Sequence, residues 1–374
     1  MITYGKLSDI YDFQYGKGNT NPDNGGTYPI YGSNGVIGGY DKWNSEDAPV
    51  IGHIGANCGS VVWASGKHFV TYNGVICQIK NNASAKYGYY ALLTSNLKSR
   101  VLGSAQPFIS YHILNRVVIY LPPIEIQNKI ASILSAYDNL IENNNKRIKI
   151  LEQMAENLYK EWFVRFRFPG HETTPIENGI PRGWTVQRMN DFCYVTDGTH
   201  DSPKPVEEGV PLITGKCISN GFIDFDEAYF ISLKDHENIK KRSGLSTGDI
   251  LFSNIGTVGN CCIVNYNQEF SVKNVIIFKP NNTSKTAYLY YWMLNDSMQA
   301  VFATQTNGAS QQFVGLNFMR RHKILVPELK VLTAFGNIIK PIIEQKNMLQ
   351  KTNDNLIKQR DLLLPRLMSG KLAI

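Results

Sequence analysis

The sequence predicts an α+β protein in which two mostly β domains are joined by two long helices that form an antiparallel coiled coil. Three observations support this prediction: the chain contains a tandem repeat, each copy begins with strand-like segments, and each copy ends in a segment with heptad spacing. A chain of 374 residues, 43% of them hydrophobic, has enough material for two packed cores. The repeat predicts pseudo-two-fold symmetry within one chain.

The tandem repeat divides the chain into two copies of similar length. "LSDIYDFQYG" (7–16) matches "MNDFCYVTDG" (189–198) at an offset of 182 residues. "GSAQPFISYHILNRVVIYLPP" (103–123) matches "GASQQFVGLNFMRRHKILVPE" (308–328) at an offset of 205 residues. An intermediate match at an offset of 200 predicts an insertion of about 18 residues in the second copy, between residues 214 and 272.

The front part of each copy, residues 1–121 and 183–326, is predicted to be a mostly β domain. Short apolar runs rich in Val, Ile, Tyr and Phe recur there, separated by the Gly and Asn residues that favour turns. Residues 86–102 and 286–303 have helical spacing instead, so each domain is expected to carry one or two helices.

The back part of each copy, residues 122–166 and 327–374, is predicted to be a long spacer helix, the second one followed by a short C-terminal tail. Residues 167–182, rich in Pro and Gly, are predicted to be the linker between the copies. A helix with a single apolar stripe must bury that stripe. The duplicate helix in the same chain is the obvious partner.

Apolar side chains at heptad spacing define the predicted seam of the coiled coil. The seam residues are Ile130, Leu134, Tyr137, Ile141, Ile148, Leu151, Leu158, Ile342, Leu349, Leu356 and Leu363. In the second helix, Lys346, Asn353 and Arg360 occupy positions where apolar residues are expected. Pro341 is expected to kink or restart this helix.

The charge of the chain permits an anionic partner without requiring one. The formal net charge is +7, with 9 basic and 6 acidic side chains in residues 1–121 and 8 and 4 in residues 327–374. Residues 183–326 carry 13 of each, so charge alone does not identify this segment as a nucleic-acid binder.

The six cysteines have neither the CxxC spacing nor the nearby histidines of a zinc site, and we expect them to be buried thiols in a reducing compartment. The sequence shows no membrane-span pattern and no signal-peptide pattern, which predicts a cytoplasmic protein without a membrane partner. No metal site is expected.

Seven stretches of the chain are informative as an ordered set. They are "YPIYGSNGVIG" (28–38), "PPIEIQNKIASILSAYDNLIENNNKRI" (122–148), "LYKEWFVRF" (158–166), "IPRGWTVQRMNDF" (180–192), "DGTHDSPKP" (197–205), "GVPLITGKCISNG" (209–221) and "LLPRLMSGKL" (363–372). Together they resemble the DNA specificity subunit of type I restriction-modification systems, over essentially the whole chain. The first copy lacks the "IPRGW" lead-in of the second, which is compatible with a shortened N-terminus.

This resemblance implies a non-catalytic, DNA-binding subunit. Each β domain would be a target recognition domain that reads one half of a bipartite target in double-stranded DNA, and the coiled coil would set the gap and bind two modification (methyltransferase) subunits. No cofactor is expected in this chain. The modification subunits would bring S-adenosylmethionine for adenine-N6 methylation, and restriction subunits, if present, would bring ATP and magnesium for DNA cleavage.

Amide and basic side chains on loops are the candidate DNA contacts, because Asn and Gln recognise adenine whereas Arg and Lys recognise guanine or phosphate. The candidates are Lys17, Asn19, Ser33, Asn34, His53, Asn57, Gln106, Thr199, His200, Lys204, Lys216, Asn220, Asn254 and Gln311. Asn, Ser and Gly also simply form turns. For Gln106 and Gln311 we favour the interpretation that their segments are the last loop and strand of each domain, which deliver the chain to its helix.

Two alternatives stay open at this point. The chain could be an interaction scaffold whose two β modules bind protein or glycan, or one β domain could be an enzyme of an unrecognised kind. The sequence contains no GxxxxGK[ST] phosphate loop and no NPPY-like motif of adenine methyltransferases, and its seven histidines are scattered.

Overall fold

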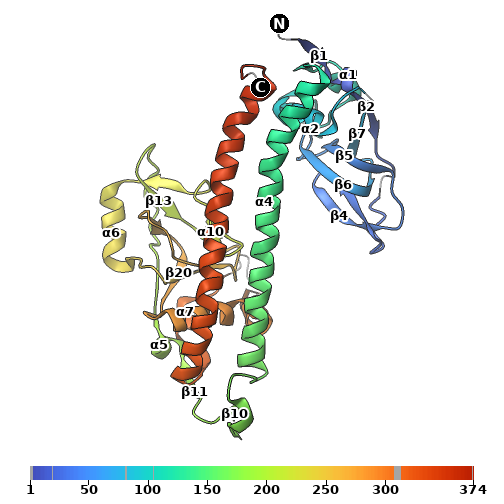
Figure 1. Ribbon diagram of the computed structural model, residues 1–374. Helices are drawn as coiled ribbons and strands as arrows, with labels where there is room; N and C mark the ends of the chain where they lie inside the picture. Colours follow the sequence, from blue (N-terminus) through green and yellow to red (C-terminus); the bar gives the residue numbers. More distant parts are fainter. Residues whose placement is uncertain (1–2, 19, 81, 104, 307–312, 373) are drawn as a thin grey trace. The chain divides into compact units, whose positions relative to one another are not determined.

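The computed structural model describes residues 3–18, 20–80, 82–103, 105–306, 313–372 and 374. Its internal contacts divide the chain into two compact units, Met1–Asn144 with Lys351–Ile374, and Asn145–Gln350. Each unit therefore combines one β domain with a stretch of each long helix. The architecture is α+β, as predicted, and Figure 1 shows the elements of both units in chain order.

The first domain is built on a six-stranded sheet with the order β2-β7-β5-β6-β3-β4. All neighbours in it are antiparallel except β3 and β6. The elements are β1 Tyr4–Lys6, α1 Leu7–Ile10, β2 Tyr11–Tyr15, β3 Tyr28–Gly32, β4 Gly35–Tyr40, β5 Ser45–Gly52, β6 Val61–Val70, β7 Gly74–Ile79, α2 Ala85–Thr94, η1 Leu97–Arg100, α3 Tyr111–Leu114 and β8 Val118–Tyr120. Tyr11, Tyr87 and Tyr90 are almost fully buried, and their rings fill the space between the sheet and α2.

The second domain has a four-stranded sheet, β12-β20-β17-β18, and a three-stranded sheet, β16-β13-β19. The elements are β11 Thr185–Arg188, α5 Met189–Phe192, β12 Tyr194–Asp197, β13 Val210–Ile213, η4 Gly215–Cys217, β14 Ile218–Ser219, β15 Phe222–Ile223, β16 Tyr229–Ile231, α6 Leu233–Ser243, β17 Ile250–Ser253, β18 Cys261–Ile263, β19 Ser271–Val272, β20 Val275–Lys279, α7 Thr283–Leu294, α8 Asp296–Thr306, α9 Leu316–Arg321 and β21 Lys323–Val326. The core of this domain includes the aromatic side chains of α7.

The two domains share one strand plan, which accounts for the sequence repeat. In the first domain β3 pairs in parallel with the end of the long strand β6, and in the second β13 pairs in parallel with β19. The equivalent of β6 is interrupted in the second domain, where β18 and β19 replace it. The predicted insertion lies in the second copy before β17, and it contains α6.

The last strand of the repeated segment (103–123 and 308–328) closes each domain. In the first domain β8 pairs with β1 at the start of the chain, and in the second β21 pairs with β11. Prolines follow both strands, and the long helices begin immediately afterwards. The strand at the end of this segment therefore leads the chain into its long helix in both domains.

The two long helices are α4, Ile124–Tyr159, and α10, Leu329–Met368 (Figure 1). A π-helical turn, η2, Lys160–Val164, extends α4. The helix α10 continues through Pro341, so the predicted restart at this residue was wrong. Pro341 has no backbone N–H and cannot donate a hydrogen bond within the helix. The neighbouring hydrogen bonds and the packing of side chains along α10 maintain the helix around it.

Within each unit the paired stretches of α4 and α10 are antiparallel. Asp138 pairs with Arg360 in the first unit, with Arg360 Nη1 2.8 Å from Asp138 Oδ1. Glu152 pairs with Lys346 in the second, with Lys346 Nζ 2.6 Å from Glu152 Oε1. A second contact in each unit, Asn144 with Asn353 and Tyr159 with Phe335, shows that partner numbers fall on α10 as they rise on α4, which is the register of an antiparallel pair. All the predicted seam residues are buried or half-buried.

The three polar residues that interrupt the second seam have polar partners on α4. Lys346 and Asn353 are 4% and 2% exposed, so both would be costly to bury alone. Asn144, itself 8% exposed, donates from Nδ2 to Asn353 Oδ1 at 2.9 Å. The three polar residues that interrupt the heptad pattern of α10 thus form polar layers with residues of α4 inside the coiled coil.

Replacing Asn353 by Leu is expected to lower the free energy of unfolding by about 1–3 kcal/mol, because the buried Asn144 amide loses its partner. The double variant Asn144→Leu/Asn353→Leu should recover most of this loss, because two apolar side chains then face each other. Chemical denaturation followed by circular dichroism measures both values. Equal losses in the single and double variants would contradict the pairing.

The predicted linker is not without structure. It contains the 3-10 turn η3, His171–Thr173, and a small hairpin of β9, Ile176–Glu177, with β10, Ile180–Pro181. All six cysteines are buried and unbridged, as expected, and burial raises the pKa of Cys193 and of Cys261 to about 12. No helix in the described part of the chain is both long and apolar enough to cross a membrane.

Candidate nucleic-acid interface

In the first domain, several candidate residues lie on loops that touch one another at one end of the sheet. Ser33 and Asn34 form the turn between β3 and β4, and Asn57 lies in the loop between β5 and β6. Asn57 Nδ2 donates to Asn34 Oδ1 at 2.5 Å, and Ser60 Oγ donates to the Ser33 carbonyl at 3.1 Å. Two loops that are far apart in the sequence are therefore held side by side.

The loop that carries Gln106 joins the same group. The Gly55 amide donates to the Pro107 carbonyl at 2.9 Å, and Ile54 and Phe108 form a short antiparallel bridge. Gln106 is exposed. It therefore presents an amide on a loop that is bonded to the loop carrying Asn57.

Lys17 lies two residues after the end of β2 and is exposed next to this group. Its amide donates to the Val70 carbonyl at 2.9 Å, and the amide of Tyr72 donates to the Gly18 carbonyl at 3.2 Å. We call the described residues of 16–18, 32–35, 52–60, 70–74 and 102–108 the first loop cluster. Asn19, another candidate, lies outside the described residues.

His53 belongs to the first loop cluster but faces its interior. The side chain is 4% exposed, its Nδ1 lies 2.9 Å from the Tyr72 carbonyl, and its ring stacks on Tyr15 with 4.1 Å between centroids. These contacts fix the loop rather than expose a donor. We therefore leave His53 out of the proposed DNA contacts.

The second domain builds an equivalent cluster with the same backbone hydrogen bonds. In the first domain Gly16 donates to Gly74, and in the second Gly198 donates to Val275 with the same length, 2.9 Å. The bridge between Ile54 and Phe108 likewise has a counterpart between Ile255 and Phe313. We call the described residues of 198–202, 214–217, 253–260, 272–274 and 313–315 the second loop cluster.

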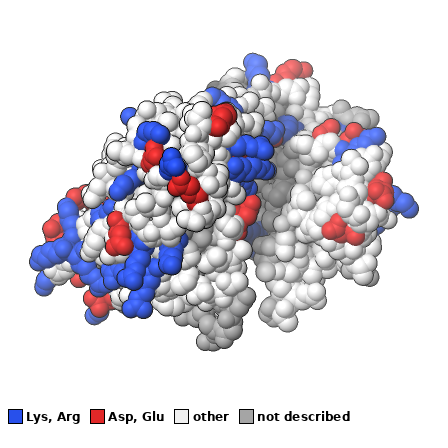
Figure 2. Space-filling view, turned by 90° about the horizontal axis from the view of Figure 1, so that it is seen from below, with Lys and Arg blue, Asp and Glu red and all other residues white. Residues whose placement is uncertain are grey.

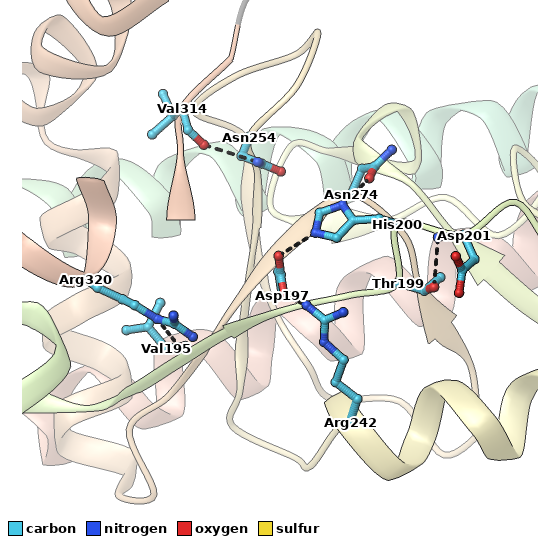
Figure 3. A network of polar contacts seen from close by, with 10 residues as sticks. All are labelled: Val195, Asp197, Thr199, His200, Asp201, Arg242, Asn254, Asn274, Val314 and Arg320. Carbon is cyan, nitrogen blue, oxygen red and sulfur yellow. Dashed lines mark hydrogen bonds and ion pairs between the residues drawn. The ribbon is translucent and has the colours of Figure 1, made fainter. Parts of the chain in front are cut away.

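A buried carboxylate organises one part of the second loop cluster. Asp197, 6% exposed at the end of β12, accepts from Arg242 Nη2 at 2.5 Å and lies 2.8 Å from His200 Nε2. His200 Nδ1 lies 3.0 Å from Asn274 Oδ1. Figure 3 shows Asp197 between the His200 ring and the Arg242 guanidinium. Asp197 thereby joins α6, the helix of the insertion, to the loop that follows β12.

This arrangement changes which side chains can act as donors to DNA. Both ring nitrogens of His200 are engaged within the domain, although the side chain is 60% exposed. Arg242 is 55% exposed and uses one Nη2 contact to Asp197, so its other N–H groups can bind a base edge or a phosphate. His200 thus holds Asp197 and Asn274 in position, and neither ring nitrogen is left to bind DNA.

The remaining candidates of the second domain are spread over exposed and buried positions. Lys204 and Asn220 are exposed, and Lys216 is exposed in η4 with Nζ 3.2 Å from Glu227 Oε2. Thr199 is 7% exposed, and Asn254 is 6% exposed and donates to the Val314 carbonyl at 3.1 Å (Figure 3). Thr199 and Asn254 are structural within the cluster. Gln311 lies outside the described residues.

Sequence reasoning missed Arg242 and Asn274. The basic run Lys240-Lys241-Arg242 at the end of α6 was a usable signal, but the insertion has no counterpart in the first copy. Asn274 was missed because its counterpart in the first copy was not a candidate either, and the match at an offset of 200 was one residue out of register. The strand pairing of Tyr15 with Val75 and of Asp197 with Ile276 makes Asn274 the equivalent of Asn73.

Several basic side chains lie on α6 and in the second loop cluster, although the second domain carries as many acidic as basic residues. The last turn of α6 carries Lys240, Lys241 and Arg242, and Lys273 lies in the second loop cluster with Nζ 2.6 Å from Ser202 Oγ. Figure 2 shows a group of Lys and Arg atoms, with Asp and Glu atoms among them, at the left of the view. Among the described residues, no group of three or more His, Cys, Asp or Glu side chains could hold a metal ion. The sites therefore offer donors to an anionic, hydrogen-bonding surface.

Fold and loops together define a class of protein: a tandem repeat of a mixed-sheet module, each copy followed by a long helix and each presenting a cluster of polar loops. Residues 3–153 and 181–359 match the model of the type I restriction modification DNA specificity domain. The chain belongs to this family, which provides DNA sequence specificity, and it contains the domain twice.

Individual relatives agree with this assignment. The type I restriction enzyme MjaIX specificity subunit of Methanocaldococcus jannaschii is 28% identical over 315 residues, which are 79% of this chain and 71% of the relative. The MjaVIII specificity subunit of the same organism is 24% identical over 300 residues, covering 77% and 70%. The crystal structure of a type I restriction-modification S subunit from M. genitalium has the same fold, with a TM-score of 0.65, 16% identity and coverage of 98% and 96%.

Proposed function

We propose that the chain is the DNA specificity subunit of a type I restriction-modification complex and that it has no catalytic step of its own. The first loop cluster reads one half of a bipartite target in double-stranded DNA, and the second reads the other half. The observation that carries this proposal is the pair of equivalent loop clusters, built by the same backbone hydrogen bonds and both presenting exposed amide or basic side chains.

The proposed DNA contacts are the exposed or half-exposed members of the two clusters and their borders. They are Lys17, Ser33, Asn34, Asn57, Gln106, Lys204, Lys216, Arg242, Lys273 and Asn274. Asn220 is exposed too, but the adjacent Gly221 lies next to Tyr290, Glu152 and Lys346, so we leave Asn220 out of the proposed contacts. Amide groups suit adenine and cationic groups suit guanine or phosphate, so each cluster has the means both to hold and to read DNA.

We further propose a division of labour along the chain. Residues 1–121 and 183–326 are the two recognition domains, residues 122–166 and 327–374 are spacer helices, and residues 167–182 are the linker. The spacer sets the gap between the half-sites, because equivalent surfaces of a duplex recur about every 34 Å. S-adenosylmethionine, ATP and magnesium belong to the partner subunits.

Exposed apolar side chains on the helices support docking of two modification subunits. On α4, Leu140, Ile150 and Met154 are 53–59% exposed although they lie on a helix whose seam is already buried. On α10, Met348 and Leu362 are 69% and 64% exposed. Apolar groups on a helix surface away from the seam favour contact with another protein.

The experiment that tests the function is single-molecule methylome sequencing of a methylation-free host that expresses this chain with the methyltransferase encoded beside it. The expected result is a new split motif with methyladenine in both halves. No new methylation, with both proteins folded and associated, would contradict the proposal and favour a scaffold that binds protein or glycan.

Replacing Lys17 or Lys204 by Ala is expected to weaken binding to all duplexes by a similar factor. Each change should also reduce the slope of log affinity against log salt concentration by about 0.9, because one phosphate contact is lost. Binding of the assembled complex to target and scrambled duplexes over a salt series measures this slope.

Lys67→Ala is the matched control for this pair of variants. Lys67 is exposed on β6, where its Nζ lies 4.7 Å from the centroid of the Trp43 ring, and it is not part of the first loop cluster. The control should keep the wild-type slope. Unchanged slopes in Lys17→Ala and Lys204→Ala would remove these two residues from the interface.

A further inference from the structure

Each loop cluster exposes one large apolar side chain at an equivalent position. Phe108 is 39% exposed and Phe313 is 49% exposed. The residues that follow them, Ile109 and Val314, are 0% and 1% exposed. In extended backbone successive side chains point to opposite sides, so burying Ile109 and Val314 turns both phenylalanines outward.

The backbone of each phenylalanine is held by a bridge at an equivalent position, although the glycines next to the two rings are not equivalent. The backbone of Phe108 forms antiparallel bridges with Ile54 and Leu102, and the backbone of Phe313 forms one with Ile255. Each ring lies over a glycine, since a Cβ added at Gly103 would be 3.4 Å from Phe108 Cδ1. At Gly315 the corresponding distance to Phe313 Cε1 would be 3.5 Å. The rings are therefore anchored at their base and exposed at their outer face.

Both domains expose an apolar ring at the same position, although their sequences have diverged. This indicates that both rings contact a partner. Residues that can hydrogen-bond to bases lie on loops of the same cluster as each phenylalanine. Gln106 and Asn57 lie on the loops next to Phe108, and Lys216 lies on a loop that Thr257 Oγ1 ties to the 253–260 loop through the Gly215 carbonyl at 3.0 Å. An apolar surface among such donors fits a ligand that presents polar and apolar groups side by side.

The major groove of an A·T base pair has this combination of groups. Adenine presents N7 and N6 to the amide of Asn or Gln, and thymine presents its 5-methyl group to an apolar side chain. Every half-site that contains a methylated adenine also contains a thymine opposite it. Phe108 beside Gln106 and Asn57 therefore matches the edge of a base pair that the function requires.

We propose that Phe108 and Phe313 contact thymine 5-methyl groups in the major groove, one in each half-site of the target. This inference rests on the proposed function, because it requires a bipartite DNA target that contains adenine. It assigns a specificity-determining role to two residues that carry no hydrogen-bonding group.

The test removes the methyl group from the DNA and the ring from the protein. Duplexes carry the target found by methylome sequencing, with each thymine of both half-sites replaced singly by deoxyuridine. Their affinities are measured for the assembled complex containing the wild-type chain, Phe108→Ala or Phe313→Ala. In each half-site, one of these single replacements should weaken binding by the wild-type complex about fourfold, the value expected for the loss of one buried methyl group.

Each variant should lose this sensitivity in one half-site only. Phe108→Ala should bind thymine and deoxyuridine duplexes equally in the half-site read by the first domain, and it should keep wild-type discrimination in the other. Phe313→Ala should show the reverse. Phe108→Leu, which keeps an apolar side chain, should keep part of the discrimination and guards against a misfolded Ala variant.

Two exposed aromatic residues outside the loop clusters provide controls. Trp43, 45% exposed, is replaced by Ala in the first domain, and Phe230, 42% exposed in β16, is replaced by Ala in the second. Both should keep wild-type sensitivity to deoxyuridine.

The outcomes separate this inference from the function on which it rests. Absence of any methylated split motif would overturn the proposed function. A split motif whose recognition is indifferent to every deoxyuridine, or equally sensitive in wild type and Phe variants, would overturn the role of the phenylalanines alone. Loss of complex assembly in Phe108→Ala or Phe313→Ala, with Phe108→Leu also impaired, would instead assign the exposed rings to a protein contact.

Discussion

Replacing Glu152 by Leu is expected to lower the free energy of unfolding by about 3 kcal/mol, because it leaves the Lys346 ammonium buried without its carboxylate. The Lys346 side chain is 5% exposed, and its Nζ lies 2.6 Å from Glu152 Oε1. The rings of Phe222 and Tyr290, with centroids 5.6 and 5.8 Å from Nζ, offer weaker cation–π contacts that do not replace a counter-charge.

The melting temperature should fall by about 6–12 °C in this variant, as expected for a unit of roughly 200 residues. The double variant Glu152→Leu/Lys346→Leu should recover most of the loss, because apolar residues replace both charges. Gln153→Leu changes the exposed neighbour of Glu152 and serves as the control. A melting temperature within 1–2 °C of wild type in Glu152→Leu would show that the ammonium reaches water.

Inserting seven residues into each long helix is expected to lengthen the gap of the DNA target by about one to three base pairs without changing either half-site. Seven residues preserve the heptad register and add about 10 Å at 1.5 Å per residue. Base pairs are spaced about 3.4 Å apart, so this added length corresponds to three of them, and the twist of the duplex opposes the full change.

Matched insertion points keep the polar layers in register. One insert is placed directly after Asn144 and the other directly before Asn353, because these two residues hydrogen-bond to each other. Methylome sequencing of the modified complex reads the new gap directly. An insert in α4 alone is the control, because it shifts the seams against each other and should abolish methylation. An unchanged gap with both inserts present would contradict the proposed spacer.

Much of the fold could be predicted from the sequence because its signals are periodic. Heptad spacing located both helices within a few residues, and matched segments revealed two copies of one domain. In the sequence, the weak seam positions were Lys346, Asn353 and Arg360. A heptad pattern in one helix does not reveal which residue of the other helix each position contacts. Their partners became evident only with the antiparallel register.

The candidate interface was less predictable, because loop residues have no periodic signal. His53 and Asn254 follow strands whose pairing turns their side chains inward, and composition alone does not distinguish them from exposed Asn57. Arg242 was missed because it depends on a contact with Asp197, 45 residues earlier in the chain. Side-chain contacts of this kind arise from tertiary packing and not from local sequence.

The polar layers of the coiled coil join unlike positions of the repeat. At the offset of 205 residues, the α4 counterparts of the three polar α10 residues are apolar. These counterparts of Lys346, Asn353 and Arg360 are Ile141, Ile148 and Ala155, respectively. If α4 paired with a second α4 in the same geometry, Glu152 would face Ile141 and Asn144 would face Ile148.

This asymmetry matters during protein synthesis. The helix α4 leaves the ribosome roughly 200 residues before α10, so for most of translation its apolar seam has no partner within its own chain. On a polysome the nearest alternative is the α4 of a neighbouring nascent chain. Because such a pair would bury Glu152 and Asn144 against aliphatic side chains, it is disfavoured. The same residues that complete the folded coil therefore keep its unfinished half available for the correct partner.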